Sequence, residues 1–247
     1  MNSFRQFKRF LIYKIRKKIN IDLENNQKHL SINELFQYYK TDKADQWQNN
    51  LGHGFSKYYE KHFKSLKNKK INILEVGSFS GASAASFVKF LPLSKIYCLD
   101  INITNFKYYS KKIKVFGLDV SKEKMVKKFF KKINISSETK FFDIIIDDGS
   151  HKLTDLIISL NTFYKNLKPG GLFVIEDFKH PNYYDHLNDC DELDIPEIIN
   201  QIKNKKIFNS NILRKEVITD ILNTFEFINT YKGLKEDSDV AFLKKLD

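Results

Sequence analysis

The chain of 247 residues contains few of the residues that interrupt or cross-link a fold: nine glycines, four prolines and two cysteines. Cys98 and Cys190 are far apart and match no metal or redox spacing, which argues against a disulfide framework. No apolar run approaches the ~20 residues that a membrane span needs, and the first residues lack the apolar core of a secretory signal. We therefore expect a cytoplasmic protein with one main core.

Positive charge is abundant but concentrated near one end. The formal net charge is +12, and residues 1–19 include seven basic residues and no acidic one. Apolar residues recur there at the spacing of a helix with one apolar stripe: Phe4, Phe7, Leu11, Ile15 and Ile19. For residues 1–20 we favour a helix packed on the body or on a second subunit of a homo-oligomer. Contact with an anionic membrane at its inner face is the next interpretation, and nucleic acid is not expected as a partner.

After residue 70, short apolar strands alternate with helices, which is typical of a parallel sheet covered on both faces. The predicted strands are residues 71–77, 95–101, 112–120, 141–149 and 171–178, followed by an antiparallel hairpin of 225–233 and 239–246. Helices are predicted at residues 22–37, with Ser31 as a possible N-cap, at 56–63, from after Gly81 up to Phe90, and at 153–167, with a turn at 168–171. This pattern predicts an α/β, Rossmann-like class I methyltransferase fold with a mostly parallel seven-stranded sheet. Its segments would be a basic amphipathic helix (1–20), a helical cap (21–66) and the cofactor-binding domain (67–247).

A glycine-containing turn follows the first predicted strand. The stretch "EVGSFSG" (75–81) joins this strand to a helix, where glycines let a ligand approach the backbone. Asp100 ends the next strand, near the position of a ribose-binding acid, and Asp119 follows the third strand, where it could reach an adenine amino group. We expect an adenosine-containing cofactor, although the turn alone would also suit a tight connection without a ligand. The candidate cofactor residues are Glu75, Gly77, Ser78, Gly81, Asp100, Asp119 and Asp147.

Two acidic pairs follow neighbouring strands: Asp147 with Asp148, and Glu176 with Asp177. Carboxylates gathered at one sheet edge would repel one another unless a cation lay among them, and oxygen donors favour a hard ion such as Mg²⁺. His151 follows the first pair and is suited to remove a proton near neutral pH. In the competing interpretation, Asp148 and Ser150 only cap the helix from Leu153.

These motifs resemble the metal-dependent sugar O-methyltransferases typified by the macrocin and mycinamicin O-methyltransferases. The resemblance covers residues 35–178 and, more weakly, the hairpin, and it rests on "YYKTDK" (38–43), "HGFSKYYEKHF" (53–63), "DDGSH" (147–151) and the "ED" at 176–177. It implies S-adenosylmethionine (SAM) as methyl donor, Mg²⁺ held by Asp148, Glu176 and Asp177, His151 as general base with Asp148 beside it, and a segment 41–43 that covers the cofactor or acceptor.

The resemblance also implies a sugar hydroxyl as acceptor, in a nucleotide sugar, a surface or capsular polysaccharide precursor or a glycosylated natural product. Alternatives are methylation of a small phenol or amine, and a non-enzymatic basic RNA-associated module. An iron-dependent hydroxylase would need two histidines and one carboxylate, and we find no such set around His151 in the sequence. The acidic, aromatic segment 183–197 suits either a solvated loop or a lid that uses Tyr183, Tyr184 or His186.

Overall fold

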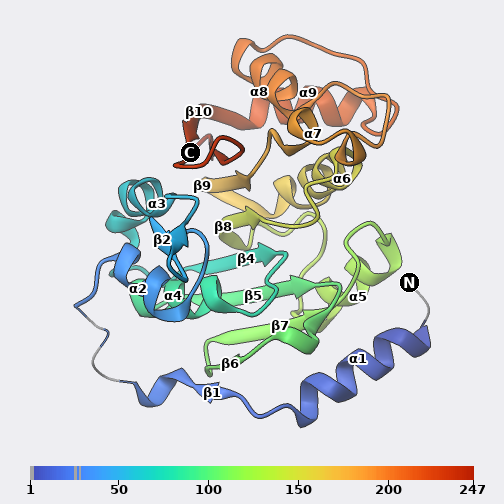
Figure 1. Cartoon of the computed structure of the whole chain (residues 1–247). Helices are drawn as coiled ribbons and strands as arrows, with labels where there is room; N and C mark the ends of the chain where they lie inside the picture. The colour runs from blue at the N-terminus through green and yellow to red at the C-terminus, as the bar shows by residue number, and fades with distance from the viewer. Residues whose placement is uncertain (1–2, 25–26, 28) are drawn as a thin grey trace. The chain divides into compact units, whose positions relative to one another are not determined.

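The computed structural model describes residues 3–24, 27 and 29–247 (Figure 1). The chain packs as two compact units: residues 1–119 with 233–236, and residues 120–232 with 237–247. The division predicted from the sequence, at residues 20 and 66, stays a prediction. Among the described residues, no helix combines the length and apolar character needed to cross a membrane.

The first unit contributes three parallel strands, in the order β4-β5-β7, to a seven-stranded sheet. They are β4 (Asn72–Val76), β5 (Lys95–Asp100) and β7 (Ile113–Gly117). Val76 lies opposite Leu99, and Asp100 lies opposite Gly117, so the carboxyl ends of the three strands meet at one edge. The predicted strands are thus confirmed, and their residues are apolar because both faces of a parallel sheet are buried.

Three helices of this unit surround an aromatic core: α2 (Ile32–Tyr39), α3 (Ser56–Phe63) and α4 (Ala82–Phe90). The Phe87 ring of α4 lies 5.6 Å from Phe36 and 5.2 Å from Tyr59. The predictions for α3 and for the end of α4 are confirmed. Within the predicted helical pattern over 22–37, the possible N-cap Ser31 is confirmed, because its capping box with Glu34 starts α2 at Ile32. The pattern is wrong at residues 22–23, which belong to a 3₁₀ turn, and residues 25, 26 and 28 lie outside the described residues.

The basic segment forms α1 (Ser3–Ile15), which packs on its own unit through polar contacts and one ring. Tyr13 contacts Phe106 edge to face at 6.4 Å, and the guanidinium of Arg9 donates a hydrogen bond to the carbonyl of Ile101. Short elements complete the unit: β1 (Ile19–Asn20), β2 (Gln46–Trp47), β3 (Asn50–Leu51), β6 (Tyr108–Tyr109), and the 3₁₀ turns η1 (Ile21–Leu23), η2 (Lys64–Leu66) and η3 (Ile103–Asn105). The predicted packing on the body is present, but not through the apolar stripe.

The second unit contributes four strands in the order β10-β11-β9-β8. They are β8 (Phe142–Asp147), β9 (Leu167–Glu176), β10 (Phe225–Lys232) and β11 (Asp239–Lys245). β8 and β9 are parallel, whereas β11 runs antiparallel to both β9 and β10, which confirms the predicted hairpin. The predicted turn at 168–171 is wrong, because β9 continues through it with Gly170 at φ +67° and a register shift opposite Phe142–Ile144.

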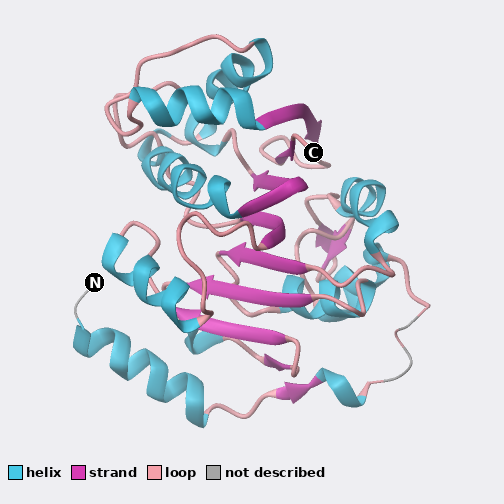
Figure 2. Cartoon of the chain, turned by 180° about the vertical axis from the view of Figure 1, so that it is seen from behind, coloured by secondary structure: helices cyan, strands magenta, loops and turns pink. Residues whose placement is uncertain are grey.

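Helices α5 (Glu123–Lys132) and α6 (Leu153–Phe163) precede β8 and β9 respectively. Figure 2 distinguishes the helices (cyan) from the strands (magenta). The remaining helical elements are α7 (His180–Tyr183), α8 (Ile195–Asn204), α9 (Lys215–Thr224), η4 (Tyr164–Asn166) and η5 (Asp185–Leu187). The predicted α/β class, with a mostly parallel sheet that finishes in an antiparallel hairpin, is confirmed. Strand–helix alternation produces this class because parallel neighbours require a crossover connection.

Candidate active site

The turn from β4 to α4 is shaped by two glycines in the left-handed region. Gly77 has φ +83° and Gly81 has φ +77°, conformations that residues with a side chain rarely adopt. The N–H of Gly81 donates to the Ser78 carbonyl at 2.7 Å, and Ser78 is buried. Phe79, at the tip, also has a positive φ and keeps 67% of its side chain exposed. The tip of the predicted glycine turn, at Phe79, is therefore exposed to solvent, whereas Ser78 at its base is buried.

Glu75 and Asp100 hold the glycine turn from two neighbouring strand ends. The Glu75 carboxylate is fully buried and accepts a hydrogen bond from the Ser83 hydroxyl of α4. The Asp100 carboxylate accepts the N–H of Phe79 at 2.7 Å and the N–H of Asn102 at 2.6 Å. The structure thus brings Asp100 to the turn, as the sequence predicted. Carboxylate oxygens can accept further hydrogen bonds, so Asp100 retains the capacity to bind ribose hydroxyls.

Asp119 lies just beyond the end of β7. The N–H of Leu118 donates to the Asp100 carbonyl at 3.0 Å, which places the segment that leads to Asp119 beside the end of β5. Asp119 is half-buried. Its contact with an adenine amino group stays a prediction.

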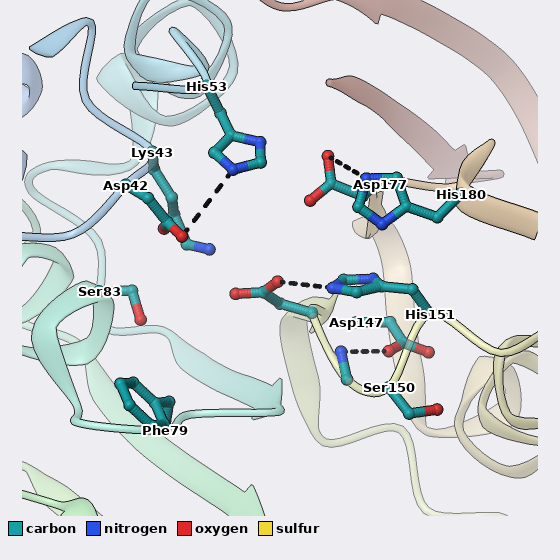
Figure 3. Close-up of polar contacts among 12 residues, drawn as sticks. Asp42, Lys43, His53, Phe79, Ser83, Asp147, Ser150, His151, Asp177 and His180 are labelled. Carbon is teal, nitrogen blue, oxygen red and sulfur yellow. Dashed lines mark hydrogen bonds and ion pairs between the residues drawn. The ribbon is translucent and has the colours of Figure 1, made fainter. Parts of the chain in front are cut away.

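Residues 41–43 form a structured segment of the same unit, next to residues 53–55. The N–H of His53 donates to the Asp42 carbonyl, and the N–H of Phe55 donates to the Lys43 carbonyl at 2.9 Å. Nε2 of His53 lies 3.9 Å from the Asp42 carboxylate (Figure 3). Lys43 is only 2% exposed, so this segment packs into its unit. That it covers a cofactor or acceptor stays a prediction.

In the second unit, β8 ends in a tight polar turn. Asp147 is buried, and its carboxylate accepts the N–H of Gly149 at 3.1 Å. Burial raises the pKa of Asp147 to about 6. His151 follows with φ +57°, a left-handed conformation that costs a residue with a side chain ~1–2 kcal/mol. Its Nε2 lies 3.8 Å from the Asp148 carboxylate. Strain of this kind clusters at functional sites.

In the competing interpretation, Asp148 and Ser150 only cap α6, but the N-cap residue of α6 is Lys152, whose own side chain makes no capping hydrogen bond. The Ser150 hydroxyl instead donates to the Asp155 carboxylate at 2.5 Å. Ser150 thus pairs with a residue inside α6, and Asp148 lies beside His151.

The end of β9 carries Glu176 and Asp177, both nearly fully buried. Asp177 has φ +49°, and its N–H donates to the Asp239 carbonyl of β11. Strand register places Asp147 opposite Ile175, so the residues that follow, Asp148 and Glu176, come at matching ends of parallel neighbours. The structure therefore supports the expectation that the two acidic pairs share one edge within this unit.

His180, which the sequence did not predict as a site residue, lies next to these residues. Nε2 of His180 lies 3.8 Å from the Asp177 carboxylate, and its ring packs edge to face on His151 with centroids 4.9 Å apart (Figure 3). His151, Asp177 and His180 each offer one ligand atom within 4.8 Å of the others. Two histidines and one carboxylate are therefore present, and the expectation that no such set surrounds His151 is wrong.

The predicted magnesium ligands were Asp148, Glu176 and Asp177, and the three-residue group just described shares only Asp177 with them. The carboxylate oxygens at the ends of β8 and β9 are the type of ligand that Mg²⁺ prefers, because this ion binds carboxylates and retains several waters. The ligand set itself stays a prediction.

The segment after β9 is tied to the hairpin. The Tyr183 hydroxyl donates to the Asp239 carboxylate at 2.9 Å, and the Tyr184 hydroxyl donates to Asp237 at 2.5 Å. His186 is exposed. Farther along, the Asp189 carboxylate accepts the N–H of Thr154 at the start of α6. Both tyrosine hydroxyls are thus engaged within the unit, and a lid role for the segment stays a prediction.

A solved structure of a methyltransferase shares the fold of this chain. The MycE methyltransferase of the mycinamycin biosynthetic pathway, solved with Mg, SAH and mycinamycin VI, superposes with a TM-score of 0.66 at 22% identity. The match covers 88% of this chain and 54% of that one. At this identity the match establishes a shared fold, that of a class I methyltransferase, as predicted. No family model matches the chain.

Two curated relatives are O-methyltransferases by name. The mycinamicin VI 2''-O-methyltransferase of Micromonospora griseorubida is 29% identical over 132 residues, 51% of this chain and 31% of its own length. The demethylmacrocin O-methyltransferase of Streptomyces fradiae is 29% identical over 153 residues, 59% of this chain and 36% of its own. The resemblance seen in the motifs is confirmed, although the chain matches only about a third of each relative's length.

Proposed function

We propose that this protein is a SAM-dependent, Mg²⁺-assisted O-methyltransferase that acts on a sugar hydroxyl. The observation that carries the proposal is His151, held in a strained conformation 3.8 Å from Asp148 at the end of β8. A general base must be held in position, and the Asp148 carboxylate beside the ring is a partner for the imidazolium. The curated relatives named above, whose printed names are O-methyltransferases, support the same reaction class.

The first unit binds the cofactor in this proposal. The turn of Gly77 and Gly81 lets the ligand approach the backbone, and Asp100 accepts hydrogen bonds from the ribose while it holds Phe79. Glu75, buried under the turn and bonded to Ser83, fixes the start of α4. The structure of MycE, which was solved with Mg and SAH, supports SAM as the methyl donor of this protein.

The second unit prepares the acceptor. Methyl transfer from a sulfonium to a hydroxyl requires the oxygen to lose its proton, and the His151 imidazole accepts it. The Asp148 carboxylate, 3.8 Å away, stabilises the imidazolium that forms. Asp148, Glu176 and Asp177 would hold Mg²⁺, which lowers the pKa of a bound hydroxyl when present. We propose a nucleotide sugar, a capsular polysaccharide precursor or a glycosylated natural product as the acceptor.

The test combines purified full-length chain, SAM, Mg²⁺ and a panel of these sugars, with small phenols and amines as competing acceptors. His151→Ala should lower turnover ~10²-fold or more and leave SAM affinity unchanged in calorimetry. His29→Ala, a change at an exposed histidine of the first unit, is the matched control. Turnover that survives EDTA, or an active His151→Ala variant, would contradict the proposed roles.

We also propose that α1 rests on an anionic lipid surface. Its apolar stripe is exposed: Phe4 is 73% exposed and Ile15 is 83% exposed. Basic residues of the same helix are also exposed, which provides the charge complementarity that anionic headgroups require. The cell location would then be the inner face of a membrane.

Sedimentation with vesicles tests this surface. Wild-type chain should pellet with phosphatidylglycerol vesicles and not with phosphatidylcholine alone, and the double variant Phe7→Asp, Leu11→Asp should stay in the supernatant. Both side chains are exposed, so the fold should tolerate the change. A lipid-independent dimer that the variant abolishes would identify a second copy of the chain as the occupant instead.

A further inference from the structure

Two imidazole rings and one carboxylate converge where β8 and β9 end. His151 follows β8, whereas Asp177 and His180 lie on the turn between β9 and α7, so two segments supply the group. The N–H of His180 donates to the Asp177 carbonyl, which turns the chain so that the His180 ring returns toward Asp177. Side-chain ligand atoms lie within 4.8 Å of one another (Figure 3).

Each imidazole keeps a nitrogen that no protein group occupies. Nε2 of His180 and Nδ1 of His151 are buried and have no hydrogen-bond partner. A neutral imidazole carries a proton on one ring nitrogen and keeps a lone pair on the other, and that lone pair can bind a metal ion.

Such a donor set differs from the one that magnesium prefers. Imidazole nitrogen suits zinc, iron, nickel and copper, whereas Mg²⁺ favours oxygen. A tetrahedral ion with bonds of about 2.0–2.2 Å separates its ligands by roughly 3.4 Å. The His180 Nε2 to Asp177 Oδ1 distance is 3.8 Å, so small side-chain rotations would close the site. Three protein ligands leave a position for water or a substrate oxygen.

We propose that His151, Asp177 and His180 form a binding site for a divalent transition metal ion such as Zn²⁺. The site depends on His180 and is distinct from an oxygen-ligated magnesium site, although both use Asp177. A neutral imidazole has one lone-pair nitrogen, and a metal bound there leaves the ring unable to accept a proton. Transition metal binding therefore removes the base from His151. This consequence, unlike the binding itself, rests on the proposed function.

Cobalt binding tests the site without any activity measurement. Metal-free full-length chain is titrated with Co²⁺, and its visible absorption bands report nitrogen and oxygen ligation; Zn²⁺ should then displace the signal. Loss of a residue that only supports a metal ligand lowers metal affinity ~10–100-fold, so His180→Asn, which removes a ligand, should weaken Co²⁺ binding by at least that factor. His186→Asn, which removes an exposed histidine of the same segment, should bind as the wild type does.

Urea midpoints show whether each variant is folded, and His151→Asn provides a second loss of one ligand. Wild-type chain that gives no cobalt bands, or a folded His180→Asn chain that binds as tightly as the wild type, would overturn the proposal. Where turnover is measurable with Mg²⁺, micromolar Zn²⁺ should inhibit the wild type and inhibit His180→Asn at least ~10-fold less well. Cobalt binding in a chain that transfers no methyl group would refute only the proposed function.

Discussion

Gly81→Ala tests the construction of the cofactor turn. At φ +77°, an alanine would adopt the left-handed conformation at a cost of ~1–2 kcal/mol. Its Cβ would also lie 2.7 Å from Cε1 of Phe106, a ring with no exposed surface. Overpacking of this kind adds ~1–3 kcal/mol. The expected loss in the free energy of unfolding is therefore ~2–5 kcal/mol.

Gly170→Ala is the matched control, because Gly170 has φ +67° and the nearest obstacle is the end of the Asp247 side chain. That side chain is 81% exposed and makes a surface ion pair with Lys244 that can rearrange, so only the conformational cost of ~1–2 kcal/mol should remain. Urea denaturation followed by circular dichroism compares the two variants. Equal losses would refute the argument that the buried Phe106 ring closes the space beside Gly81. Calorimetry should also show weaker SAM binding for Gly81→Ala alone.

Asp100→Asn should weaken SAM binding ~10–100-fold in calorimetry, because a charge-assisted hydrogen bond is worth ~1.5–3 kcal/mol, and unchanged affinity would remove Asp100 from the ribose site. Burial lowers the pKa of His62 to about 4, so the folded chain binds fewer protons than the unfolded chain between pH 4 and the ordinary histidine value. The free energy of unfolding should therefore fall as the pH drops through that window, and less so in His62→Gln; identical pH profiles would contradict the assignment. Ser31→Ala should cost ~1 kcal/mol through loss of the capping box, measured as a lower urea midpoint, whereas an unchanged midpoint would show that the cap contributes nothing.

Much of the fold is predictable from the sequence because its signals are local. Continuous apolar runs predicted β4, β5 and β8 to within a few residues, and the helix over Ser56–Phe63 was predicted at its exact bounds. The errors also have local causes. At 168–171, proline and glycine suggested a turn, but β9 absorbs them with a shift in register. At 22–37, the helical pattern began too early, although its possible N-cap, Ser31, is the residue that caps α2.

Some residues of the candidate site were also predictable from local patterns, and others were not. Residues that follow a strand, such as Asp100 and Asp148, were predictable because the carboxyl ends of parallel strands share one edge. His180 was not, since its distance from His151 depends on the turn after Asp177 and on the strained backbone of both segments. Nor could the sequence reveal that α1 packs through Tyr13 and leaves Phe4 exposed.

The amino-acid sequence by itself determined the order of strands and helices, the glycine turn and the positions of the acidic pairs, because periodicity and backbone preference act between near neighbours. Only the tertiary structure decided which side chains face one another. The pairing of two imidazoles with one carboxylate arises from contacts between segments 26 or more residues apart, whose geometry no local pattern encodes.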